Sequence, residues 1–383
     1  MSKIRILITG DFCPHQRVEE LCLAGNFKEI YGDVLPILQE KDLSVTNLEC
    51  PLCMGEYPIT KSGPHLKAHP KCIELLKYGC FDVVTLANNH IMDHGRQGLK
   101  ETLHVCRQNG IETVGAAENA KEAGRPFYRK INGINLAIIN MTEHEFSIAT
   151  DDEPGANPLD PIFNYHQILA AKEASDFVIV VVHGGHEHYN LPSPRMVQTY
   201  RFFVDLGASV VIGHHPHCVS GYEVYKNAPI FYSIGNFIFD WKEPLNGDWF
   251  EGFMVALEIE NRRVSALQVI PYNQCKDRIG LSSMNDAQEQ SFLNKVKELS
   301  LIIQDDSMLL EKWKLFSFSK NYQYLTGLFN FGKARRFLLQ KGMPAHVLTR
   351  NKNWPRLLNL IQCEAHRDIL IDNLRLLVQK LTR

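Results

Sequence analysis

The sequence has no hydrophobic run long enough to cross a membrane as a helix, which takes about 20 consecutive apolar residues. The N-terminus also lacks the apolar core of a signal peptide. Its first apolar run is short and interrupted by charge, and residues 3–9 enter a predicted strand directly. Membrane-spanning and secreted proteins are therefore classes that we do not expect.

The ten cysteines show no disulfide-framework spacing. Only one C-x-x-C pair occurs, Cys50 and Cys53, and a structural zinc site normally needs a second pair. We interpret these two thiols as incidental. Free thiols suit a reducing compartment, which predicts a cytoplasmic protein.

A large net charge is also missing, since 41 Lys and Arg offset 43 Asp and Glu to give −2 at pH 7. The charge is unevenly distributed. Residues 331–383 carry eleven basic and three acidic side chains, a net +8, which leaves −10 for the remainder. No nucleic-acid-binding module accompanies this basic segment, so nucleic acid is not an expected partner.

What the 383-residue sequence does contain is an alternation of short strands and amphipathic helices. Unbroken apolar runs at 81–86 and 177–182 are typical of buried strands in a parallel sheet. Helical spacing or caps predict helices at 161–174 and 194–206. The alternation predicts an α/β domain at residues 1–275, followed by a helical, basic extension at 276–383.

Side chains that can bind metals follow five of the predicted strands. They are Asp11, Glu49, Asn89 with His90, His183, and His215 with His217. Ligands of open α/β sheets bind at the carboxyl ends of strands. Each residue taken alone fits a turn or cap at least as well, as at Asp93, which could be a helix N-cap. The convergence of carboxylate, carboxamide and imidazole nevertheless predicts a metal-dependent hydrolase.

His215 and His217 are two residues apart, so in extended backbone their side chains would point the same way. They could then share one metal ion or a pair. Oxygen and nitrogen donors without obvious thiolates favour Mn, Fe or Zn over Ca. The sequence therefore predicts one or two divalent metal ions.

Six ordered motifs resemble those of the bacterial capsule-synthesis (CapA, poly-gamma-glutamate biosynthesis) proteins over about residues 3–260. They are Gly10-Asp11, Asn47-Leu48-Glu49, Ala87-Asn88-Asn89-His90 with Asp93 and Gly95, His183-x-Gly185-x-Glu187, Gly213-His214-His215-Pro216-His217, and Ser233-Ile234-Gly235-Asn236-Phe237. That family is in turn similar to calcineurin-like metallophosphoesterases. The resemblance implies two packed mixed β-sheets flanked by helices.

The resemblance also implies roles for the strand-end residues. The metal ligands would be Asp11, Glu49, Asn89, His183, His215 and His217. Glu49 would take the bridging position that is usually Asp, and His90 would face the phosphoryl leaving group. Asp93 and Glu187 join His90 as candidate catalytic residues. The candidate substrate-binding residues are Asn88, His214 and Asn236, and His214 is also an alternative ligand to His215.

The sequence departs from the metallophosphoesterase pattern at its opening motif. The usual Asp-x-His is here Asp11-Phe12-Cys13, so one imidazole ligand is missing. A Cys13 thiolate among oxygen donors would be unusual, and His15 could substitute only through a bent loop. This favours weak or absent binding of one metal. Relatives in this family are usually exported or membrane-anchored, so the lack of an anchor here argues against an extracellular polymer substrate.

The extension beyond residue 275 carries no motif and predicts helices at 286–303, 308–315, 322–340 and 357–381. In the last helix, Leu370, Leu374, Leu377 and Leu381 form an apolar seam, with Arg367, Arg375 and Lys380 around it. We expect this helix to dock by its leucines, on its own domain or on a second copy in a homodimer. Peripheral contact of the basic face with an anionic membrane or polymer is the alternative.

Two functional hypotheses follow. The first is metal-dependent hydrolysis of a phosphoester or related bond of an anionic small molecule or polymer, in capsule, exopolysaccharide or polyglutamate biosynthesis. His90 would then protonate the leaving oxygen or stabilise its charge. The second is a non-catalytic polymer-assembly or binding factor that keeps the metal pocket. The presence of His90 beside Asn89 favours the hydrolase. The missing histidine of the Asp-x-His motif favours the non-catalytic factor.

Overall fold

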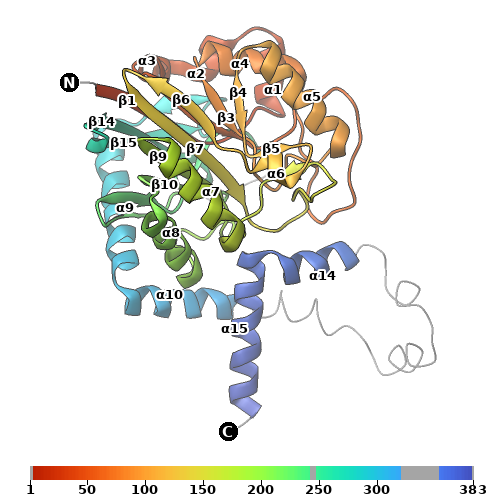
Figure 1. Ribbon diagram of the computed structural model, residues 1–383, viewed down its shortest axis with the longest axis vertical. Helices are drawn as coiled ribbons and strands as arrows, with labels where there is room; N and C mark the ends of the chain where they lie inside the picture. The colour runs from red at the N-terminus through yellow and green to blue at the C-terminus, as the bar shows by residue number, and fades with distance from the viewer. Residues whose placement is uncertain (1–2, 242–246, 321–352, 382–383) are drawn as a thin grey trace.

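The structure, a computed structural model, describes residues 3–241, 247–320 and 353–381, with side chains in the last range from 355 to 374. Within these ranges the chain forms two β-sheets stacked between layers of helices (Figure 1). The helix predicted at 322–340 lies outside the described residues. The predicted fold class, mixed β-sheets flanked by helices with C-terminal helices, is confirmed.

The larger sheet has the strand order β16-β15-β14-β1-β2-β3-β4, with β13 also paired to β1. Its strands are β1 (Lys3–Cys13), β2 (Leu43–Leu48), β3 (Val83–Thr85), β4 (Glu112–Val114), β13 (Asn236–Phe239), β14 (Glu251–Glu260), β15 (Arg263–Gln274) and β16 (Leu281–Ser283). β1 runs parallel to β2 and β13 but antiparallel to β14, so the sheet is mixed.

The smaller sheet has the order β11-β12-β10-β9-β7-β6. Its strands are β6 (Phe127–Ile131), β7 (Ile134–Thr142), β9 (Phe177–His183), β10 (Val210–His214), β11 (Tyr222–Tyr225) and β12 (Ala228–Phe231). The central strands β7, β9, β10 and β12 are parallel. A separate pair joins β5 (Ala116–Ala117) to β8 (Gly155–Ala156).

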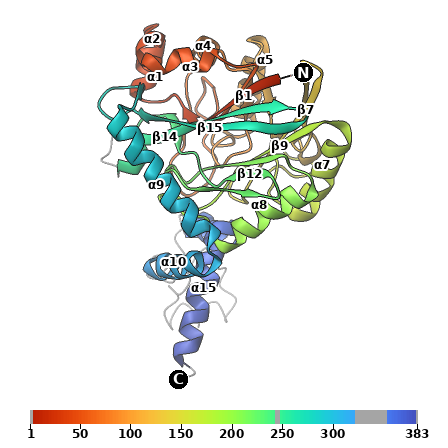
Figure 2. The same cartoon turned by 90° about the vertical axis from the view of Figure 1, so that its left-hand side faces the viewer.

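Three hydrophobic layers hold the sheets and helices together. Between the sheets, alternate residues of β1 (Ile4, Ile6, Ile8) share a core with those of β7 (Ile134, Leu136, Ile138), as the two-residue period of a strand requires. The other faces are covered by helices (Figure 2). Those on the larger sheet are α1 (Arg17–Leu23), α2 (Phe27–Tyr31), α3 (Leu35–Gln39), α4 (Ile73–Tyr78) and α5 (Gly95–Gln108).

The smaller sheet is covered by α7 (Pro161–Ala174) and α8 (Pro194–Leu206), whose predicted bounds are confirmed. Their ends are set by local chemistry. Asp160 and Ser193 cap the two N-termini by accepting backbone N–H groups, and a proline follows each cap. Gly207 ends α8 with a φ of 118°, a conformation that glycine adopts without a side-chain clash. A short helix, α6 (Ala120–Ala123), precedes β6.

The larger sheet continues past the predicted domain boundary at residue 275. β16 pairs with β15, and α9 (Asp286–Gln304) contributes Phe292 and Val296 to the core between the sheets. The boundary at 275/276 stays a prediction, but the first part of the predicted extension packs as part of the α/β domain.

The remaining C-terminal helices are α10 (Asp306–Ser319), α14 (Asn353–Gln362) and α15 (Glu364–Leu381). The single helix predicted at 357–381 is wrong in one respect, because the chain bends at Cys363 between α14 and α15 (Figure 1). Contacts of this junction with the loop after β7 hold the bend, and helical periodicity cannot indicate such contacts. None of the described helices is both long and apolar enough to span a membrane.

Candidate metal centre

The six predicted metal ligands lie together at the carboxyl ends of strands from both sheets. Asp11 is near the end of β1, Glu49 directly follows β2, and His183 ends β9. The register of β9 with β10 places His214 opposite His183, so the loop with His215 and His217 starts beside it. All six side chains belong to residues that are at most 5% exposed.

A first group of donors consists of Asp11, Glu49 and His183, which each offer a ligand atom within 4.8 Å of the others. His183 Nε2 lies 3.5 Å from Glu49 Oε1, and His183 Nδ1 lies 3.9 Å from Asp11 Oδ1. Asn89 Oδ1 adds a carboxamide oxygen 3.0 Å from His183 Nε2. Four of the predicted ligands therefore meet at this point.

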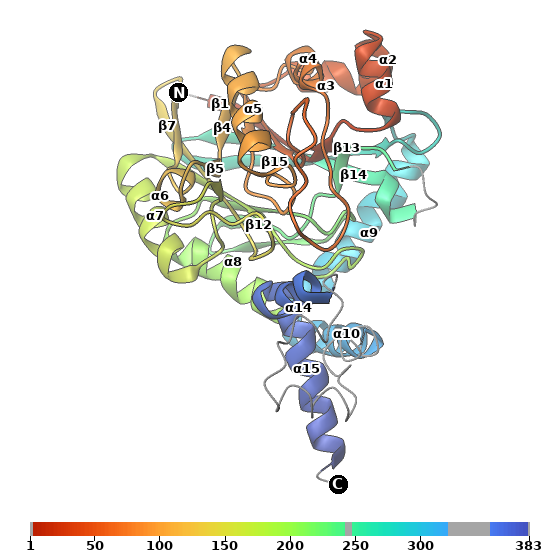
Figure 3. The same ribbon diagram turned by 90° about the vertical axis from the view of Figure 1, so that its right-hand side faces the viewer.

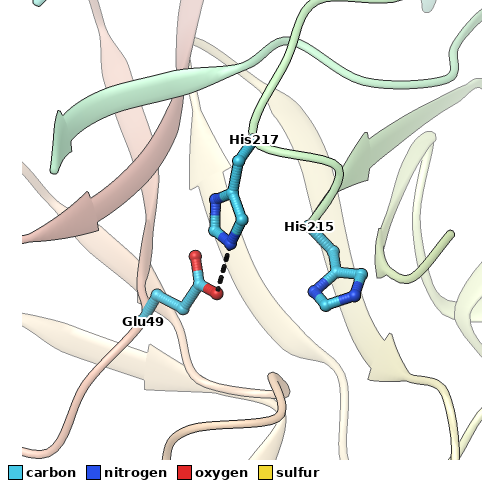
Figure 4. Close-up of side chains that lie close together, drawn as sticks. All are labelled: Glu49, His215 and His217. Atoms are coloured by element: carbon cyan, nitrogen blue, oxygen red, sulfur yellow. Dashed lines mark ion pairs between the residues drawn. The ribbon is translucent and has the colours of Figure 1, made fainter. Parts of the chain in front are cut away.

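A second group consists of Glu49, His215 and His217. His217 Nε2 lies 3.6 Å from Glu49 Oε1, and Figure 4 shows this ring pointing at the carboxylate with His215 beside it. His215 Nδ1 is also 3.1 Å from His183 Nε2, which joins the two groups. Glu49 belongs to both groups, so its place fits the bridging role that the resemblance implies.

Glu49 provides the test of whether a cation fits here. Both of its carboxylate oxygens are buried without a hydrogen-bond partner among the described residues. Burial and the charge of Asp11 raise the pKa of Glu49 well above its usual range, so the ionised form is costly without a counter-charge. A divalent cation would offset that cost, and the donors around it are oxygen and nitrogen atoms. The residues present therefore fit a divalent metal.

Two of the predicted histidine ligands, His183 and His215, are in surroundings that favour neutral imidazole. Burial lowers the pKa of His183 well below its usual value and lowers that of His215 to about 4. Both rings are then neutral at pH 7, and neutral imidazole is the form that binds metal ions.

The extended backbone predicted for His215 and His217 is wrong. β10 ends at His214, and both histidines have positive φ, 98° and 55°. The ring centroids still come within 5.8 Å of each other. A sharp turn around Pro216 therefore brings the rings together. Such backbone conformations are costly for non-glycine residues and concentrate at functional sites.

The three predicted substrate-binding residues are buried beside the predicted ligands and are at most 1% exposed. Asn236 Oδ1 is 2.9 Å from His217 Nδ1, and Asn88 Oδ1 accepts the His90 backbone N–H at 3.1 Å. His214 Nδ1 lies 3.1 Å from Asp11 Oδ1, whereas His215 joins Glu49 and His217. All three positions suit the orientation of other groups, and direct contact with substrate stays a prediction.

Neither Cys13 nor His15 supplies the missing imidazole. Cys13 is buried in the outer core beside Cys50, and burial raises the pKa of its thiol. The His15 ring packs against Phe239 with the ring centroids 5.3 Å apart. The imidazole that lies beside Asp11 is that of His214.

A second cluster, at the edge of the centre, contains His90, Asp93 and Lys61. His90 Nδ1 is 2.6 Å from Asp93 Oδ2, which also accepts the Leu66 backbone N–H at 2.7 Å. The Lys61 ammonium forms an ion pair with the other oxygen of Asp93, and its side chain is only 3% exposed. Burial and the Lys61 charge lower the pKa of His90, while Asp93 opposes them. Asp93 therefore orients the His90 ring rather than facing the opening itself.

The centre opens to the surface through two adjoining cavities of about 290 and 190 Å³. His90, Glu187 and His188 line both, so the predicted catalytic residues His90 and Glu187 are accessible to a substrate. The smaller cavity also has an aromatic wall of Phe239, Trp241 and Trp249. The larger one is lined by the loop after β2 and by the C-terminal helices, which meet below the domain (Figure 3).

Several residues of this opening were missed by sequence reasoning. They are Lys61, Glu145, His186, Lys320, Asn359 and His366. All except His186 come from loops or C-terminal helices that carry no strand-end motif, so no sequence signal marked them. His186 and His188 follow the predicted strand that ends at His183. The three histidines within residues 183–188 were the one sequence signal that could have marked His186 as part of the site.

Comparison with known proteins assigns the chain to a family. The model of the family described as "Bacterial capsule synthesis protein PGA_cap" matches residues 5–241. The chain belongs to this family. The match spans every predicted metal ligand and ends before β14, so the C-terminal helices lie outside it. The predicted resemblance is confirmed, and the family belongs to the metallophosphoesterase-like superfamily.

Individual relatives agree with this assignment. The chain is 31% identical over 281 residues to the capsule biosynthesis protein CapA of Bacillus anthracis, covering 71% of this chain and 68% of that protein. It is 34% identical to the PGA biosynthesis protein CapA of Bacillus subtilis, covering 60% of this chain and 62% of that protein. Among solved structures, a hypothetical protein from Thermus thermophilus matches with a TM-score of 0.43 and 16% identity, covering 70% of this chain and 99% of that one.

Proposed function

We propose that this protein is a metal-dependent hydrolase of phosphoesters or related bonds that works in capsule or polyglutamate biosynthesis. The observation that carries the proposal is the buried Glu49 carboxylate, which is shared by two donor groups and has no hydrogen-bond partner among the described residues. A bridging carboxylate of this kind suits one or two Mn, Fe or Zn ions. When bound, such ions polarise a phosphoryl oxygen and activate water.

The protein's own residues supply orientation and proton handling. Asp93 and Lys61 fix the His90 ring at the wall of both cavities, where it can hold or pass a proton at the leaving oxygen. Glu187 lines the same cavities. Lys61 and Lys320 at the larger cavity support an anionic substrate, either a small molecule or the end of a polymer.

A non-catalytic binding factor is the second candidate. It is favoured by the second residue after Asp11, where Cys13 packs in the core in place of the usual imidazole ligand. Such a protein would keep the metal pocket to bind an anionic polymer. A cytoplasmic place of action is part of the proposal in either case.

The two candidates are separated by metal analysis and a substrate panel. Protein purified without chelator is analysed for metals and then assayed on phosphomonoesters, phosphodiesters and anhydrides with added Mn. We expect turnover in the wild type and a loss of about a hundredfold or more in His90→Gln, with bound metal retained, because a general acid contributes on that scale.

Two results would contradict parts of this proposal. An unchanged rate in His90→Gln removes His90 from the mechanism. A wild-type protein that binds metal but hydrolyses no member of the panel supports the binding factor instead.

A further inference from the structure

Three side chains of types that can bind a metal meet beside the candidate metal centre. Glu145 lies in the loop after β7, Cys363 at the bend between α14 and α15, and His366 in the first turn of α15. Each offers a ligand atom, and these atoms lie within 4.8 Å of one another. Two of the three residues come from the helices beyond the family match, so the family's own site does not account for them.

The chemistry of this trio is that of a zinc site. Cys363 is 1% exposed, and its Sγ is 3.9 Å from Glu145 Oε1. In a tetrahedral zinc site with Zn–S near 2.3 Å and Zn–O near 2.0 Å, sulfur and oxygen are about 3.5 Å apart. A contraction of a few tenths of an ångström therefore brings the pair to ligand spacing. Thiolate, imidazole and carboxylate together favour zinc over Mg or Ca.

The backbone around the trio is held in place by neighbouring contacts. Gln362 Nε2 donates to the Glu145 backbone oxygen at 2.7 Å, and Glu364 accepts the His144 backbone N–H at 2.9 Å. His144 and Glu364 also pair through their side chains at 2.8 Å. Residues next to Glu145 and Cys363 thus fix the loop and the helix junction to each other. The donors are brought together before any metal binds, which lowers the ordering cost of binding.

No lysine or arginine forms an ion pair with Glu145 among the described residues, although Glu143 and Glu364 nearby are paired with Arg195 and His144. The Cys363 thiol makes only a long contact with Glu145 Oε1, at 3.9 Å, and its sulfur accepts the His366 backbone N–H. A cation can therefore bind Glu145 without displacing a lysine or arginine.

We propose that Glu145, Cys363 and His366 bind a zinc ion that is separate from the metal centre at Glu49. The ion would fasten the junction of α14 and α15 to the loop after β7. Glu145 and His366 also line the larger cavity, so the same ion would form part of the wall of the opening. This proposal does not depend on hydrolase activity.

Cobalt substitution tests it, because a cysteine thiolate bound to Co²⁺ gives a charge-transfer band in the near ultraviolet. The full-length protein is stripped with chelator, dialysed and titrated with Co²⁺ alone. We expect the band in the wild type, its loss in Cys363→Ser, and its weakening in Glu145→Gln. Zinc content should fall by about one ion per chain in Cys363→Ser. A circular dichroism melt checks that each variant is folded.

Two matched variants distinguish this site from the other centre. Cys13→Ser tests the buried thiol that lies nearest to Asp11 in sequence, and Asp11→Ala removes a ligand of the Glu49 centre. Both should keep the Co²⁺ band. Absence of the band in the wild type, or a band that survives in Cys363→Ser, overturns the proposal. A band that persists while Asp11→Ala changes no metal content would instead count against the Glu49 centre.

Discussion

At the scale of single residues, Asp11 and His217 are the clearest tests of the metal centre. Asp11 Oδ2 is 3.6 Å from His217 Nδ1, and both belong to donor groups with Glu49. Replacing either by Ala would remove a predicted ligand, so bound metal should fall. His104→Ala is the control, because His104 is exposed on α5. Equal metal by elemental analysis in all three variants would show the ligand assignment to be wrong.

Lys61 gives a second residue-scale prediction, which rests on the proposed activity. Its ammonium is one of the causes that lower the pKa of His90. Lys61→Gln removes that charge, so the pKa of His90 should rise and the corresponding limb of the pH–rate profile should move to higher pH. Lys67→Gln is the control, since Lys67 pairs with the exposed Glu56. A profile that is reduced in height but not shifted would contradict this positioning role.

The residues of the centre could be predicted where a side chain able to bind a metal directly follows, or ends, a predicted strand. Asp11, Glu49 and His183 were expected there because parallel strands deliver their carboxyl ends to one edge. The positive φ of His215 was not predictable, because non-glycine residues rarely adopt it and only the packed loop enforces it. Lys61 was missed because a lysine in a polar loop normally stays in solvent, and only the tertiary pairing with Asp93 buries it.

At the scale of elements, Arg195 joins α8 to α15. Its Nη2 is 2.5 Å from Glu143 Oε1 and its Nε is 2.6 Å from Asp368 Oδ2. Arg195→Ala leaves both carboxylates largely buried without a cationic partner, although the Gly185 N–H and the Ser193 hydroxyl still donate to them. The free energy of unfolding should therefore fall by about 3–5 kcal/mol, as when one partner of a buried ion pair is removed. Urea denaturation followed by tryptophan fluorescence measures the change.

The control is Arg96→Ala, because Arg96 pairs with Glu118 and Glu153 at the surface. Exposed pairs contribute about 1 kcal/mol or less, so this variant should remain close to the wild type. Equal losses in the two variants would mean that the Arg195 pairs do not hold α15.

Elements with strong local signals were predicted closely, and elements defined by distant contacts were not. α7 and α8 carry their caps in their own sequence, so both bounds could be predicted. The bend at Cys363 depends on Glu364 meeting His144, which is far away in the chain. β16 was missed for the same reason, since its three residues are a strand only through their pairing with β15.

At the scale of the whole molecule, the C-terminal helices should contribute to stability. A small hydrophobic cluster joins three of these helices. It contains Trp313 of α10, Leu360 of α14, and Ile369 and Leu370 of α15, and Leu374 packs against it. The first half of the predicted leucine seam therefore docks on the chain's own helices. The side chains of Leu377 and Leu381 lie outside the described residues, as do those of Arg375 and Lys380.

Removing the residues after Trp354 should lower the melting temperature by several degrees or change the oligomeric state. Each fully buried leucine contributes roughly 1.5–3 kcal/mol, which exceeds the contribution of exposed charges. Differential scanning calorimetry and light scattering measure the two outcomes. Rapid proteolytic loss of this segment without either change would show a free basic tail, and a membrane or polymer surface would become its expected partner.

The position of β1 has a consequence for how this protein is made. β1 comes long before β14 in the sequence, yet the two are neighbours in the middle of the larger sheet, with Lys3 opposite Glu260. During synthesis, the edge of β1 that pairs with β14 stays without its partner strand until β14 has been made. Contacts between residues so distant in sequence also form slowly. A nascent chain that stalls before residue 260 would expose that edge and become a substrate for chaperones. Since the donors extend from Asp11 to His217, metal loading should follow synthesis of nearly the whole domain rather than guide its early folding.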